Sequence, residues 1–170
     1  MDPALARACA RFFARRLTGP AEARSAVLDA LVRGEPYSFA RRALSGAAAA
    51  GISRHSALRL GLIAEVARAT LRTCAEACAA DPLPTRMQRA RRVLAADTLL
   101  TFSWELAAAV EAERASTVRD ALARLLGARG LLASGLGRSP GDREAGGAME
   151  RIDSSVEAFL VEVLAPSRRW

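Results

Sequence analysis

The chain has 170 residues, 51% of them hydrophobic, and a formal net charge of +7 at pH 7. This size is that of one domain with its own core, and the basic balance favours acidic partners such as nucleic acid, anionic lipid or an acidic protein face. The sequence contains no run of about 18 apolar residues, so we expect no membrane-spanning helix. The odd cysteine count, three, argues against a disulfide framework and for a reduced, cytoplasmic setting.

The N-terminal half divides at glycines, prolines and capping residues. Asp2 and Pro3 predict the start of a helix that runs to Leu17. Three further helices follow, each between recognisable start and stop signals. They are expected at Ala21–Arg33, at Ser38–Ala50 with Ser38 as its cap, and from a Ser53 cap to about Ala80.

In the C-terminal half, Thr85 is expected to open the longest helix, which ends at about Arg114. Thr117 and Asp120 resemble a capping box, which predicts another helix to about Ala133. The glycine-rich segment 134–147 is expected to be a flexible loop, and Ala148–Leu164 a final amphipathic helix.

The fold class expected is all-α, because alanine, leucine and arginine favour helix and no segment alternates apolar and polar residues as strands do. Between Val93 and Val110 the longest helix is apolar on nearly every side, which is typical of the middle of a bundle. We therefore expect a single domain, 1–170, of six or seven helices around this segment, in a globin-like or Bcl-2-like arrangement. The Asn-Trp-Gly-Arg signature of cellular Bcl-2 relatives is absent, and only Trp104 matches it.

Side chains that could carry catalysis are few. His55 is the only histidine, which excludes most zinc sites and gives no support to a Ser-His-Asp triad. It could be a haem ligand, a phosphate acceptor, a DNA contact or an ordinary boundary residue. Asp97 falls inside the apolar segment and would need an arginine partner or a proton if it is enclosed there. It is either a structural ion-pair residue, a residue at a locally exposed edge of the helix, or part of the floor of a ligand pocket. Asp97 and Trp104 are therefore the candidates for the floor of a ligand pocket.

One segment, 43–62, has the pattern of a helix-turn-helix. Small alanines precede Gly51, an apolar residue follows, and Ser53 caps a second helix. In a DNA-binding protein Arg54, His55 and Arg59, together with Ser56, would face bases or phosphates. The same pattern also suits a simple corner between two bundle helices, because the second helix continues far past the length of a recognition helix.

The turn Gly51-Ile52-Ser53, the following Ala57-Leu58-Arg59 and the later helix Arg92 to Glu113 also resemble the haem-free, globin-like sensor domains of bacterial stress-signalling regulators. The resemblance covers roughly residues 25 to 130. It implies a helical regulatory domain without a cofactor. In that family the sensor domain is attached to an effector domain, and we expect no such domain within these 170 residues.

The function expected is a non-enzymatic regulatory module that binds a partner protein, such as an acidic or amphipathic helix, through an apolar groove edged by arginines. A homodimer is also possible. The candidate contact residues are Arg54, His55, Arg59, Arg86, Arg89 and Arg92. The alternatives are a DNA-binding transcriptional regulator that uses the helix-turn-helix, and a sensor of haem or a small molecule. No cofactor and no metal are expected for the favoured interpretation.

Overall fold

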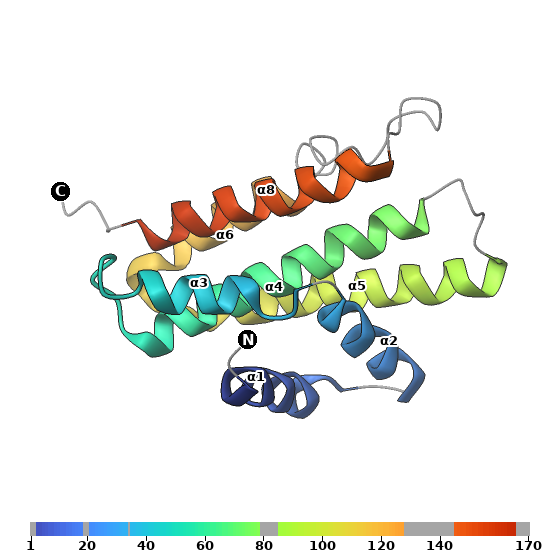
Figure 1. Ribbon diagram of the computed structural model, residues 1–170, viewed down its shortest axis with the longest axis horizontal. Helices are drawn as coiled ribbons and strands as arrows, with labels where there is room; N and C mark the ends of the chain where they lie inside the picture. Colours follow the sequence, from blue (N-terminus) through green and yellow to red (C-terminus); the bar gives the residue numbers. More distant parts are fainter. Residues whose placement is uncertain (1–2, 19–20, 34, 79–84, 128–144, 166–170) are drawn as a thin grey trace.

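In the computed structural model, the residues described are 3–18, 21–33, 35–78, 85–127 and 145–165. All regular structure among them is helical, which confirms the all-α prediction. There are seven helices in these ranges (Figure 1): α1 (Pro3–Arg16), α2 (Ala21–Val32), α3 (Ser38–Gly46), α4 (Arg54–Ala77), α5 (Arg86–Ala108), α6 (Ala112–Leu126) and α8 (Ala145–Leu164).

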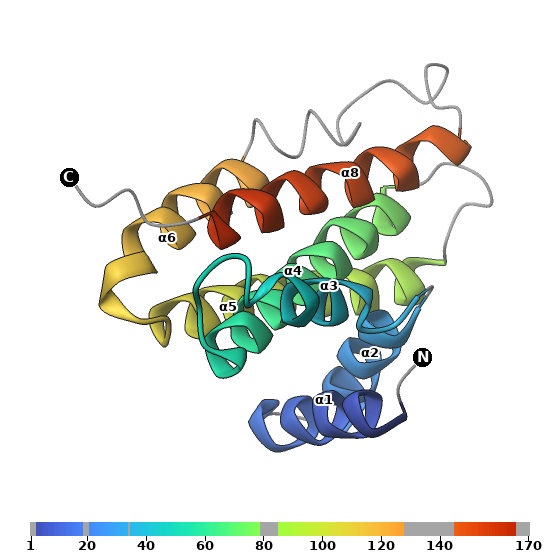
Figure 2. The same cartoon turned by 60° about the vertical axis from the view of Figure 1, so that its left-hand side comes forward.

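The central helix of the bundle is α4. It packs against α2, α3, α5, α6 and α8, and every residue from Leu60 to Leu71 is buried. Two views show α4 enclosed, with α6 and α8 side by side on one flank and α1 and α2 together on the other (Figures 1 and 2).

The prediction that the segment Val93–Val110 is enclosed on all sides is wrong. Only one side of α5 faces the core, through small residues such as Ala95 and Ala107 and larger ones such as Leu99 and Phe102. Val93 and Leu94 are more than half exposed instead. The enclosed helix is instead α4, whose buried residues combine alanines and Gly61 with five large aliphatic side chains: Leu60, Leu62, Ile63, Val66 and Leu71.

Close packing of α3 on α4 depends on Gly61. A Cβ atom at this position would lie 2.5 Å from the Cα atom of Ala40 and 3.0 Å from the carbonyl oxygen of Phe39. Real Cβ atoms do not approach neighbours so closely, so only glycine lets the two backbones meet at this crossing.

Helix boundaries are confirmed in part. Ser53 caps α4 by accepting a bond from the Ser56 N–H at 3.1 Å, and Thr85 opens α5 with a capping box. Ser38 is already helical and is not a cap. The long helix ends at Ala108, and α6 starts at Ala112, so the expected capping box at Thr117 is also wrong.

The loop expected at 134–147 lies mostly outside the described residues. Its last residues, 145–147, belong to α8, which begins three residues before the position expected from the sequence.

Candidate protein-interaction surface

The exposed side of α5 carries large apolar side chains, and we call it the outer face of α5. Met87 is 66% exposed, Leu94 61%, Val93 54% and Trp104 38%. Exposed polar and small residues complete the face: Ala90, Asp97, Thr101, Glu105 and Ala108. Single exposed apolar residues are ordinary on a protein surface, but several on one helix mark a surface that another molecule can cover.

A capping box fixes where this face begins. The hydroxyl oxygen of Thr85 accepts a hydrogen bond from the Gln88 N–H at 3.2 Å, and the Gln88 side chain accepts one from the Thr85 N–H at 2.9 Å. These two bonds satisfy donors that the first turn leaves unpaired. They fix Arg86 as the first residue of α5, while the packing of residues such as Leu99 and Phe102 on the core decides which side chains point outward.

Arginines surround the start of the outer face. Arg86, Arg89 and Arg91 are exposed, and none of them forms an ion pair or side-chain hydrogen bond with any residue in the described ranges. Arg92 is half-buried and donates to the Glu76 carbonyl oxygen at 2.7 Å. Cations at the positive end of a helix dipole destabilise it by about 0.3–1 kcal/mol each, and α5 has no acidic residue in its first turn. A carboxylate from another molecule would reduce this electrostatic repulsion.

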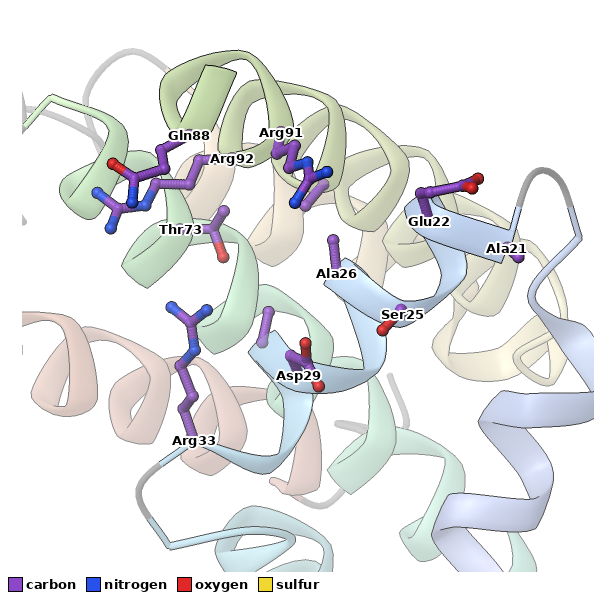
Figure 3. A pocket seen from close by; sticks show the side chains of 12 residues that line it. Ala21, Glu22, Ser25, Ala26, Asp29, Arg33, Thr73, Gln88, Arg91 and Arg92 are labelled. Atoms are coloured by element: carbon purple, nitrogen blue, oxygen red, sulfur yellow. The ribbon is translucent and has the colours of Figure 1, made fainter. Parts of the chain in front are cut away.

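A cavity of about 520 Å³ lies next to this face, between α2, α4 and α5. Its apolar lining comes from alanines: Ala21, Ala26, Ala30 and Ala95. Arg91 and Arg92 of α5 and Arg33, which directly follows α2, surround it, while Glu22 and Asp29 line the α2 side (Figure 3). Arg33 is already paired with Glu76. Arg91 belongs to both the cavity and the surface around the outer face.

The two residues expected at the floor of a ligand pocket lie elsewhere. Asp97 is exposed on α5, and Trp104 is partly exposed on the same side of the helix. Of the alternatives for Asp97, the structure therefore has the locally exposed edge, and its carboxylate has no ion-pair partner among the residues described. Both residues become part of the surface.

The residues expected to read DNA lie at the start of α4. Arg54 and His55 are exposed, but Arg59 donates a hydrogen bond to the Ala109 carbonyl oxygen and contacts the His55 ring nitrogen at 3.0 Å. Ser56 is buried and donates to Glu111. These bonds join the first turn of α4 to the corner between α5 and α6, and they occupy two of the four side chains that a recognition helix would present.

A buried ion pair in α4 was not expected, because Glu65 and Arg68 fit the polar stripe of that helix. Glu65 is 1% exposed, and its carboxylate lies 2.8 Å from Arg68, whose side chain is 5% exposed. The other carboxylate oxygen accepts from the Phe39 N–H at 2.7 Å and the Ala40 N–H at 3.4 Å. Burial raises the pKa of Glu65, while Arg68 and the two N–H groups oppose this effect. In the sequence, Glu65 and Arg68 stand three residues apart among mostly apolar residues, and this spacing was the signal that could have predicted a buried ion pair.

This pair replaces the missing cap of α3. Tyr37, the residue before α3, has a left-handed backbone with φ 61° and gives no side-chain cap. Glu65 satisfies the first N–H groups of α3 from the neighbouring helix. Arg68 also donates to the Glu35 carbonyl oxygen at 2.9 Å and lies over the Phe39 ring. The arrangement is structural, since all the polar atoms at its centre bind one another.

Comparisons with known proteins identify no relative: no family model, no curated protein and no solved structure matches the chain. Within the described ranges, no group of three or more histidine, cysteine, aspartate or glutamate side chains is placed to hold a metal ion. In the same ranges, no helix combines the length and apolarity required to cross a bilayer.

Proposed function

We propose that this protein is a regulatory interaction module that binds an acidic, amphipathic helix of a partner protein along the outer face of α5. The observation that carries the proposal is the position of Leu94 and Val93, more than half exposed, beside arginines with no described counter-ion. Apolar anchors and unpaired guanidinium groups on one helix fit a ligand that has both an apolar stripe and carboxylates.

The apolar residues supply the affinity. Full burial of an exposed leucine or valine side chain contributes about 1.5–3 kcal/mol. A partner that covers the exposed part of Leu94, Val93 and Trp104, which are 61%, 54% and 38% exposed, gains a corresponding part of this for each residue. Partner helices bind through residues spaced three, four and seven apart, and the outer face offers a matching ridge with Met87, Leu94 and Thr101 along one line.

The arginines supply orientation. Guanidinium groups pair with carboxylates through two parallel hydrogen bonds, and Arg86, Arg89 and Arg91 lie at one end of the face. The acidic end of the partner helix therefore lies over the first turns of α5. The alanine-lined cavity beside Arg91 accommodates a side chain from the partner's edge.

Fluorescence of Trp104 tests this proposal. In a Trp170→Phe background, Trp104 is the sole tryptophan, since the chain has two. A designed helical peptide with a leucine stripe and a glutamate edge is titrated into the protein, beside a matched peptide with lysines in place of the glutamates. We expect saturable binding of the acidic peptide and at least about tenfold weaker binding of the basic one.

Two matched variants locate the binding. Leu94→Asp places a charge in the proposed interface, whereas Val161→Asp makes the same change at an apolar residue of α8 that is 66% exposed. We expect Leu94→Asp to weaken binding by about 10- to 100-fold and Val161→Asp to leave it unchanged. Equal effects of the two substitutions, or equal affinity for the two peptides, would overturn the proposal.

A further inference from the structure

Charge along the outer face of α5 is polarised. Arg86, Arg89 and Arg91 lie in its first half, whereas Asp97 and Glu105 lie from its middle onward. The second half of α5 is therefore itself an acidic, amphipathic helical surface, with Trp104 as its apolar element. We infer that a second copy of this chain binds the outer face, with the two α5 helices antiparallel about a two-fold axis. This inference rests on the proposed function, because it uses the same surface.

Helical spacing gives one register that satisfies both charge and apolar contacts. Arg91 and Glu105 are about four helical turns apart and lie on the same flank of the face; Val93 and Trp104 are about three turns apart on the opposite flank. A two-fold axis perpendicular to α5 keeps each flank on its own side. With the axis near residue 98, Arg91 meets Glu105 of the second copy, and Val93 meets Trp104 of the second copy.

Other orientations of the same two helices are less favourable. A parallel pair would set the arginines of one copy against those of the other, and like charges across an interface weaken binding. The antiparallel pair is also isologous, so every favourable contact occurs twice. Leu94, near the middle of the face, lies opposite the region of Thr101 in this register.

The size of the face predicts a weak dimer. Helix α5 is about 35 Å long at 1.5 Å per residue and roughly 10 Å wide, so it covers on the order of 350 Å² per copy, less than the roughly 800 Å² of a standard interface. The two Asp97 carboxylates also come near each other at the axis. We therefore expect a dissociation constant of about 10–100 µM, with the second copy and the partner helix competing for one face.

Sedimentation velocity of the full chain, from about 5 to 300 µM, tests the inference by charge exchange. Arg91→Glu alone sets glutamates against Glu105, and Glu105→Arg alone sets arginines against Arg91. Each variant should dimerise at least about tenfold more weakly than wild type. An equimolar mixture of the two should dimerise as wild type does, because all charge pairs in the mixed dimer are opposite. Asp97→Asn should strengthen self-association.

Arg41→Glu is the control for net charge, since Arg41 is exposed on α3, away from α5. It should leave the dimer unchanged. A wild-type chain that stays monomeric at 300 µM, or a mixture that dimerises no better than its separate components, would overturn the inference. Peptide binding measured through Trp104 on the same samples is independent: if it persists while self-association is absent, the proposed function stands and the second copy is not its partner.

Discussion

Replacing Arg68 by methionine tests the energetic role assigned to the ion pair inside α4. The substitution keeps most of the side-chain volume and removes the charge that faces Glu65 at 2.8 Å. It leaves a carboxylate that is 99% inaccessible without a cation, and it also removes the donor to the Glu35 carbonyl oxygen. Breaking a buried pair in this way costs about 3–5 kcal/mol. We expect a loss of this size in the free energy of unfolding at pH 8.

The loss should depend on pH, with a defined sign. Burial already raises the pKa of Glu65 above its usual value of 4.5, and removing Arg68 raises it further. For a carboxyl whose pKa is higher in the folded state, the stabilising contribution is complete below the unfolded pKa and is lost as the pH rises through the folded one. Arg68→Met should therefore cost less at pH 4.5 than at pH 8.

Urea unfolding followed by circular dichroism at the two pH values measures this. Arg124→Met is the matched control, because Arg124 pairs with Glu162 but both side chains are largely exposed, at 61% and 46%. An exposed pair contributes about 0–1 kcal/mol. The double substitution Arg68→Met with Glu65→Gln should restore part of the stability and remove the pH dependence. A loss below about 1 kcal/mol for Arg68→Met, or the same loss at both pH values, would refute the reasoning.

Other features of the fold give three further predictions. Gly61→Ala should destabilise the protein by about 1–3 kcal/mol, since its Cβ atom would lie 2.5 Å from the α3 backbone. Gly46→Ala is the control, because its Cβ atom would have its nearest neighbour at 3.7 Å, an ordinary contact distance, and it should not destabilise. Thermal unfolding compares the two variants. Ser53→Ala should cost about 1 kcal/mol in urea unfolding through loss of the α4 cap, and a loss near zero would contradict the capping bond. Burial raises the pKa of Cys9 to about 11. A thiol reagent at pH 8 should therefore modify the exposed Cys78 first and Cys9 only in urea. Rapid modification of Cys9 in the native protein would be inconsistent with its burial.

Local signals in the sequence predict the helices well, because they act over a few residues. Ser53 and Thr85 open α4 and α5 as expected. In each case the side-chain oxygen accepts from the N–H group three residues later, and this bond does not depend on where the helix packs. Ser38 is the exception. The donors at the start of α3 are satisfied by Glu65, 26 residues away from Phe39 in sequence, and no local pattern reports such a partner.

Which helix is central could not be predicted from the size of its apolar residues. The apolar stretch from Val93 to Val110 made α5 the expected centre, whereas α4 holds that place with Gly61, several alanines and five large aliphatic residues: Leu60, Leu62, Ile63, Val66 and Leu71. Small residues let neighbouring helices approach closely on several sides, and this advantage depends on the neighbours rather than on the helix alone. On α5, Val93 and Leu94 point outward while Leu99 and Phe102 face the core, and the sequence pattern does not distinguish these two groups.

The sequence predicts some residues of the candidate surface, but it does not predict which of them lie on one side of a helix. Arg86 and Arg89, expected as contact residues, are exposed at the start of α5, and Asp97 and Trp104 lie on the same helix, although as surface residues. Arg54 and His55, also expected as contacts, lie in the first turn of the central helix α4 and are not part of the outer face of α5. The sequence identified the residue types, but the three-dimensional packing decides which of them share a surface.

Mapping the bound acidic peptide by NMR tests the central claim most directly, because backbone amide shifts report the position of the partner on every helix at once. With the peptide at saturation, we predict the largest shift changes from Met87 to Trp104 along α5, together with the Arg91 side of the cavity. Changes concentrated instead on α1, α8 or the first turn of α4, with α5 unaffected, would contradict the account.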